Sequence, residues 1–113
     1  MSKIDQMHHA ALAVLWRLTF GTSALSVFEV LDALRSSGRD PVLTQGLKRV
    51  LLSICNAGAA RHQHAIVIDA AAITVFLHRV AEQPVDGRAF HYSPRSSTKG
   101  EPRWTLRDVP EAA

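Results

Sequence analysis

The fold of this chain is decided by residues 23–64, which read SALSVFEVLDALRSSGRDPVLTQGLKRVLLSICNAGAARHQH. Apolar side chains recur there at intervals of three and four residues, the spacing that puts them on one face of an α-helix. Residues 37–41, SGRDP, interrupt the pattern, because Gly and Pro end helices. The stretch therefore predicts two amphipathic helices, over residues 24–36 and 43–57, joined by a turn.

Each of these helices has an expected inner face. Over residues 24–36 the buried stripe consists of Leu25, Phe28, Val30, Leu31 and Leu34. Over residues 43–57 it consists of Leu43, Leu47, Val50, Leu51 and Ile54, and Cys55 lies in the same apolar run as an expected buried thiol. The outside of the second helix is then polar, with Thr44, Gln45, Lys48, Arg49, Ser53 and Asn56.

Two more helices flank this pair. Over residues 4–18 the helical spacing is kept by Ile4, Met7, Ala11, Val14, Leu15 and Leu18, which indicates an amphipathic helix. Gly21 is expected to end it, and the adjacent His8 and His9 are expected on its outer rim. Further along, residues 59–68 fit a short strand, and Asp69 is a plausible N-cap for a helix over residues 69–82.

The last part of the chain alternates as strands do. Phe90 and Tyr92 point to one side of the first expected strand, and Trp104 and Leu106 to one side of the second. The loop over residues 93–102 that joins them is polar and basic at its middle, and too long for a tight turn. These segments predict a hairpin with a long basic loop at its tip.

Length and composition limit the class of protein. The chain has 113 residues, 47% of them apolar, which suits one core. We therefore expect a single domain over residues 1–108 and a flexible tail over residues 109–113. One cysteine excludes an intramolecular disulfide and suits a reducing cytoplasm. No stretch approaches the roughly 20 apolar residues of a membrane span, and the polar N-terminus is unlike a signal peptide.

Helices followed by a hairpin with a basic tip are the parts of a winged helix-turn-helix. Residues 27–38, VFEVLDALRSSG, resemble the second helix and glycine exit of ferric-uptake-regulator-type repressors. Residues 43–58, LTQGLKRVLLSICNAG, resemble their recognition helix. The turn over residues 37–42 is longer than in that family, and a further helix is inserted before the hairpin. The metal-rich dimerisation half of the family has no counterpart, so metal sensing is not carried over, and neither a metal nor a cofactor is expected.

The resemblance implies a sequence-specific DNA-binding transcriptional regulator, with the helix over residues 43–57 in the major groove of double-stranded DNA. Gln45 can pair with adenine, and Lys48 or Arg49 with guanine. The hairpin loop would be the wing, reaching the backbone or the minor groove. The candidate DNA-binding residues are Thr44, Gln45, Lys48, Arg49, Ser53, Arg61, Arg95, Lys99 and Arg103.

Charge distribution agrees with this hypothesis. The whole chain carries a modest formal net charge of +3. Between Arg35 and His64, however, five basic residues accompany the single acid Asp40. Such a local excess attracts phosphates, although it also fits a merely solvated basic face.

Two alternatives remain open from the residues alone. In a second registration, the helix over residues 69–82 is the recognition helix, with Thr74, His78, Arg79 and Gln83 facing outward. The chain can also be a winged-helix module for protein–protein interaction, as an adaptor or inhibitor. Catalysis and metal binding are disfavoured, because no nucleophile motif or phosphate loop occurs and the six histidines include only the pair His62 and His64 at strand spacing.

A homodimer is expected, because one small winged helix buries too little DNA to bind tightly alone. The candidate dimer surfaces are the first helix, through Leu12, Leu15 and Trp16, and the helix over residues 69–82.

Overall fold

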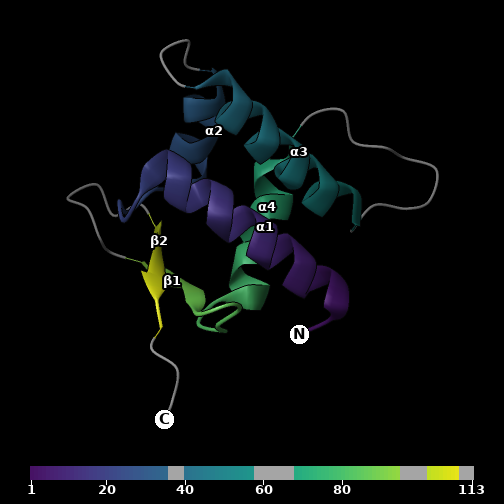
Figure 1. The fold of residues 1–113 in the computed structure, drawn as a ribbon, viewed down its shortest axis with the longest axis vertical. Helices are drawn as coiled ribbons and strands as arrows, with labels where there is room; N and C mark the ends of the chain where they lie inside the picture. Colours follow the sequence, from purple (N-terminus) through teal and green to yellow (C-terminus); the bar gives the residue numbers. More distant parts are fainter. Residues whose placement is uncertain (36–39, 58–67, 95–101, 110–113) are drawn as a thin grey trace.

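The structure is a computed structural model, and it describes residues 1–35, 40–57, 68–94 and 102–109. Across these ranges the elements follow the order α1 (Lys3–Phe20), α2 (Val27–Arg35), α3 (Pro41–Ala57), α4 (Ala70–Val80), β1 (Arg88–Ser93) and β2 (Arg103–Asp108) (Figure 1). The expected class, mainly helical with a small antiparallel hairpin, is confirmed. The strand expected over residues 59–68 and the loop over residues 93–102 lie largely outside the described residues.

Side-chain caps fix where the helices begin. Ser2 caps α1 by accepting a hydrogen bond from the Asp5 amide, and Asp69 caps α4, as expected, by accepting one from Ala71. The Asp40 carboxylate accepts one from the Val42 amide at 2.8 Å, which starts α3 at Pro41. Each cap satisfies an amide that the first turn leaves without an internal partner.

α2 starts three residues later than the apolar pattern predicts. Ser26 and Glu29 form a reciprocal capping box, because each backbone amide donates to the other side chain. The preceding residue, Leu25, is extended and exchanges two backbone hydrogen bonds with Trp104 of β2, at 2.9 and 2.7 Å. The segment between α1 and α2 is thereby tied to the edge of the hairpin.

The hairpin has the expected register and orientation. Phe90 pairs with Leu106 and Tyr92 with Trp104 across the antiparallel ladder. Phe90, Trp104 and Leu106 are buried and Tyr92 is half-buried, so the aromatic side of the hairpin faces the helices. At the far end, the Val109 amide donates to the Gly87 carbonyl at 2.7 Å, so the chain is still held at the first residue of the expected tail.

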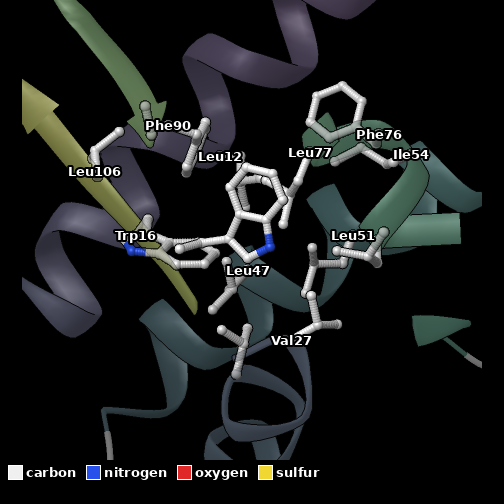
Figure 2. Close-up of a cluster of buried hydrophobic side chains, with 14 of the residues drawn as sticks. Leu12, Trp16, Val27, Leu47, Leu51, Ile54, Phe76, Leu77, Phe90 and Leu106 are labelled. Atoms are coloured by element: carbon white, nitrogen blue, oxygen red, sulfur yellow. The ribbon is translucent and has the colours of Figure 1, made fainter. Parts of the chain in front are cut away.

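One core joins all the elements. Figure 2 shows Trp16 of α1 between Leu47 of α3 and the hairpin residues Phe90 and Leu106, with Leu77 of α4 close by. Trp16 is completely buried, and its ring meets that of Phe90 edge-on with 5.3 Å between centroids. The predicted inner face of α3 is confirmed for Leu47, Leu51 and Ile54, and Cys55 is buried as expected.

α1 lies against α3, and the two helices run antiparallel. Gly46 of α3 faces Leu15, where an added Cβ would stand only 3.2 Å from a Leu15 methyl group. Seven residues further along α3, the Ser53 hydroxyl lies 3.1 Å from Nε2 of His8. The missing side chain of Gly46 therefore lets the two helices approach closely.

The sequence interpretation of α1 was wrong about which face points inward. The core takes Leu12, Ala13, Trp16 and Phe20, and it also takes His8 and His9. The regular stripe of Ile4, Met7, Ala11, Val14 and Leu18 is exposed instead. α1 carries apolar side chains on two faces, and the core is built from the one that holds the bulky aromatic rings. His8 and His9 are therefore not on the outer rim, and the buried Leu12 and Trp16 cannot form a dimer surface.

Phe28 of α2 is a second correction, because it was expected in the buried stripe and is 72% exposed. The stripe over α2 is instead made by Val27, Val30 and Leu34. The shift follows from the capping box, which places Ser26 and Val27 in the interior at the start of the helix.

Candidate nucleic-acid interface

The outer face of α3 brings together three of the predicted residues, Gln45, Lys48 and Arg49. All three side chains are exposed, and none forms a hydrogen bond or ion pair with another described residue. Lys48 and Arg49 follow Gln45 by three and four residues, so the three side chains project from the same side of the helix. An exposed amide beside two exposed cations is suited to base edges and phosphates.

The electrostatic setting of this face is one-sided. None of the 17 residues of α3 is acidic, and no Asp or Glu occurs anywhere between Asp40 and Asp69. Asp40 itself is engaged as the cap of α3. The charges of Lys48 and Arg49 are therefore not neutralised within their own helix.

Thr44 and Ser53 lie on opposite flanks of this face, because they are nine residues apart in the helix, and both have structural partners. The Thr44 hydroxyl donates to the Asp40 carbonyl at 2.9 Å, in the first turn of α3. Ser53 contacts His8 of α1, as described above. Burial of His8 lowers the pKa of its imidazole, so the neutral ring is favoured in this contact. Both hydroxyls thus help to hold α3 in place.

Arg103 was predicted to face DNA and instead connects two elements of the fold. Its guanidinium forms an ion pair with Glu29 of α2 at 3.0 Å and donates to the Ala24 carbonyl at 3.1 Å. It therefore fixes the extended segment that pairs with β2. Alternation along the strand places Arg103 off the core side correctly, but it does not reveal that a neighbouring helix lies there.

Arg61, Arg95 and Lys99 lie outside the described residues, as does most of the expected wing loop. The candidate site on the structure is therefore the outer face of α3.

The polar side chains of α4, the alternative recognition helix, are engaged with the protein. Arg79 forms a bidentate ion pair with Asp5 of α1, at 2.8 and 2.9 Å, and this guanidinium lowers the pKa of the Asp5 carboxyl. Gln83 donates to the Arg79 carbonyl, and the Thr74 hydroxyl donates to that of Ala70. The exposed face of α4 that remains is largely apolar, with Val75 60% exposed.

His78 completes a ring cluster between α4 and the hairpin. Its imidazole meets Tyr92 and Trp104 with centroid distances of 4.6 and 5.0 Å. These rings and Phe28 line an apolar pocket of about 150 Å³ that also includes Thr74. His78 and Thr74 thus border a pocket beside the hairpin.

Sequence reasoning missed the two buried histidines of α1. His9 is completely buried against Phe90, with 5.0 Å between ring centroids, and its ring nitrogens have no well-aligned hydrogen-bond partner among the described residues. Burial lowers the pKa of His9 and so favours the neutral imidazole. The helical spacing of His9 with Leu12, Ala13 and Trp16 was the signal that could have found it.

The described ranges contain neither a candidate metal site nor a candidate membrane span. No three His, Cys, Asp or Glu side chains of those ranges lie close enough together to hold a metal ion. None of the helices described is both long and apolar enough to cross a membrane. No protein-family model matches the chain, and no curated protein or solved structure is significantly similar to it.

Proposed function

We propose that this protein binds double-stranded DNA through the outer face of α3 and acts as a sequence-specific regulator of transcription, without catalysis of its own. The observation that carries the proposal is the exposed set of Gln45, Lys48 and Arg49, which have no described protein partner on a helix without acidic residues. Protein surfaces normally intersperse charges of both signs, so a one-signed helix face is suited to a polyanion.

The fold supplies further support for a winged helix. α2 and α3 are consecutive helices, and the hairpin that follows them bonds to the segment before α2 through Leu25 and Trp104. In this proposal α3 enters the major groove, and the loop over residues 93–102 is the wing. Gln45 reads adenine, Arg49 reads guanine, and Lys48 contacts the phosphate backbone.

The engagement of α4 favours α3 as the recognition helix over the second registration. To read DNA, α4 would have to release Arg79 from Asp5 and expose Val75 to a polar groove. Gln45, Lys48 and Arg49 need no such rearrangement.

The test is a fluorescence-anisotropy titration of mixed-sequence duplex DNA at low salt. Arg49→Ala is expected to weaken binding by about 1–3 kcal/mol, which is several-fold to roughly a hundredfold. Arg107→Ala is the matched control, because it removes an exposed arginine near the far end of β2. Equal losses in the two variants would show that α3 is not the interface. If Arg49→Ala weakens binding and Arg107→Ala does not, selection of bound duplexes from a random pool would identify the target sequence.

The second candidate function, a protein-interaction module, is favoured by one specific observation. On one side of α1 five apolar residues are exposed: Ile4, Met7, Ala11, Val14 and Leu18. Contiguous apolar patches on a folded domain mark places where another macromolecule binds. Absence of DNA affinity at low salt, for a protein that is folded, would leave this as the better candidate.

A further inference from the structure

The exposed stripe of α1 follows a heptad pattern. Ile4, Met7, Ala11, Val14 and Leu18 are separated by three, four, three and four residues, and all five are exposed. The four large side chains are 56%, 68%, 49% and 62% exposed, respectively. This spacing is that of the a and d positions of a coiled coil, which one helix presents to another helix.

Its own chain does not use this stripe within the described residues. The opposite face of α1 already packs in the core through Leu12 and Trp16, and Leu15 on the flank packs toward α3 at Gly46. A helix that needed only its own core would be polar on its outer side. The outer stripe therefore calls for a second helix, and a copy of α1 offers a seam of the same length and spacing.

We propose that two copies of this chain associate through their α1 helices, packed antiparallel about a two-fold axis that passes close to Ala11. Ala11 is the midpoint of the stripe, and its small side chain lets the two backbones approach. The inference does not rest on DNA binding, because it depends on the outer face of α1 alone. It places the two-fold axis beside α3, since α1 and α3 lie side by side (Figure 1).

The helix dipoles favour the antiparallel over the parallel arrangement. Lys3 is at the N-terminal end, and Arg17, near the C-terminal end, forms an ion pair with Asp108 at 2.9 Å. The Asp108 carboxylate remains 71% exposed. An antiparallel pair brings the positive N-terminal end of each α1 toward the negative C-terminal end of the other copy. Lys3 of each copy then approaches Arg17 of the other, whose charge is already paired with Asp108. A parallel pair would align the two helix dipoles in the same direction, which is unfavourable.

The size of the contact predicts a reversible dimer. A single helix pair lies at the low end of specific interfaces, roughly 1,200 Å² in total, so we expect a dissociation constant of about micromolar. A two-fold pair also buries the same patch on both copies, which is the isologous arrangement of most homodimers.

The first experiment is sedimentation velocity over a concentration series from about 1 to 200 µM, which spans the expected dissociation constant. The unaltered protein should shift from monomer to dimer, and Met7→Glu and Val14→Glu should each raise the dissociation constant more than about tenfold, because a charge would enter the seam. Val75→Glu is the matched control, since Val75 is similarly exposed but lies on α4. Circular dichroism would check that each variant is folded.

Cysteine cross-linking then tests the orientation. The only native cysteine, Cys55, is buried, so the unaltered protein is a suitable blank. Ala11→Cys should form an intermolecular disulfide. Ile4→Cys and Leu18→Cys should not, because an antiparallel pair would hold their two copies about 21 Å apart along the helices. The double variant Ile4→Cys/Leu18→Cys should cross-link.

Two results would overturn the proposal. A protein that remains monomeric across the concentration series would show that a second copy does not occupy the stripe. Efficient cross-linking of Ile4→Cys and Leu18→Cys as single variants would show a parallel pair. DNA binding is measured separately by anisotropy, so its failure would leave the dimer result unaffected.

Discussion

α1 and α3 lie side by side, yet their outer faces have opposite chemistry. On α1 the outer face is an apolar stripe from Ile4 to Leu18. On α3 it carries Gln45, Lys48 and Arg49. A surface that excludes water and one that holds a hydrated charge require different partners. We therefore propose two roles for these neighbouring helices, association through α1 and recognition of a polyanion through α3.

The largest expected effect is the difference in stability between substitutions on the inner and the outer face of α1. Trp16→Ala should destabilise the protein by about 3–5 kcal/mol, because it empties a completely buried site. Leu18→Ala, on the outer stripe, should change monomer stability by less than about 0.5 kcal/mol. Urea unfolding at a concentration where the protein is monomeric measures both. A costly Leu18→Ala would show that the stripe is covered by its own chain.

The next effect is a contrast between an arginine of the hairpin, expected to stabilise the fold, and a lysine of α3, expected to bind DNA. Arg103→Ala should lower the free energy of unfolding by about 1 kcal/mol, because it removes the ion pair with Glu29 and the hydrogen bond to the Ala24 carbonyl. The ion pair is partly exposed, so solvent weakens its contribution. Arg103→Ala should leave the salt dependence of DNA binding unchanged. Lys48→Ala should do the reverse, with unaltered stability and weaker binding. Thermal unfolding measures the stability of each variant, and anisotropy on the same samples measures its DNA binding. A flattened salt dependence for Arg103→Ala would show that this arginine contacts DNA.

The stability of the protein should depend on pH through the two buried histidines on the inner face of α1. The pKa values of His8 and His9 are lowered by burial, whereas both rings protonate normally in the unfolded chain. The unfolded state then binds more protons as the pH falls below about 6.5, so stability should decrease, by at most about 1.4 kcal/mol per pH unit for each histidine. Above that pH both states hold neutral rings and the effect vanishes.

His9→Leu is the variant that isolates this effect. It replaces a buried titratable ring by an apolar side chain, so the loss of stability between about pH 6.5 and 5 should become shallower. Urea unfolding at several pH values measures the slope. An unchanged slope would mean that His9 is protonated in the folded state.

The smallest expected effect concerns the link between α1 and α4. Arg79 is half-exposed in its ion pair with Asp5, so solvent screens much of the attraction. The contribution of the pair should be about 1 kcal/mol or less in a double-mutant cycle of Asp5→Asn and Arg79→Met. Since the pKa of Asp5 is lowered, this contribution is present above the ordinary value of 3.8 and should fade as the pH falls below it. A coupling energy that persists unchanged well below that pH would argue against an ionic contact.

Much of the fold follows from the residues alone. The spacing of Leu47, Leu51 and Ile54, the cap Asp69 and the alternation of Phe90, Trp104 and Leu106 each depend on local geometry, and each prediction is confirmed. When a helix has two apolar faces, the spacing of its residues does not show which face is buried. For this reason the prediction of the inner face of α1 was wrong. Only the volume of Trp16 and Phe20, fitted against Phe90, decides between them.

The candidate site was predictable only in part, for the same reason. Exposure of Gln45, Lys48 and Arg49 follows from their position opposite the apolar stripe of α3. The partners of Ser53, Arg79 and Arg103 are 45, 74 and 74 residues away in the chain. Such distant pairs depend on how the helices pack, and no local pattern reveals them.

The most direct test of the proposed recognition face is the salt dependence of affinity for mixed-sequence duplex DNA, measured by anisotropy for the unaltered protein and for Lys48→Ala/Arg49→Ala. We expect the logarithm of the binding constant to fall linearly with the logarithm of the salt concentration. The double variant should flatten the slope by about 0.9 for each phosphate that the protein no longer neutralises. No affinity of the unaltered protein at low salt, or an identical slope in the double variant, would contradict this account.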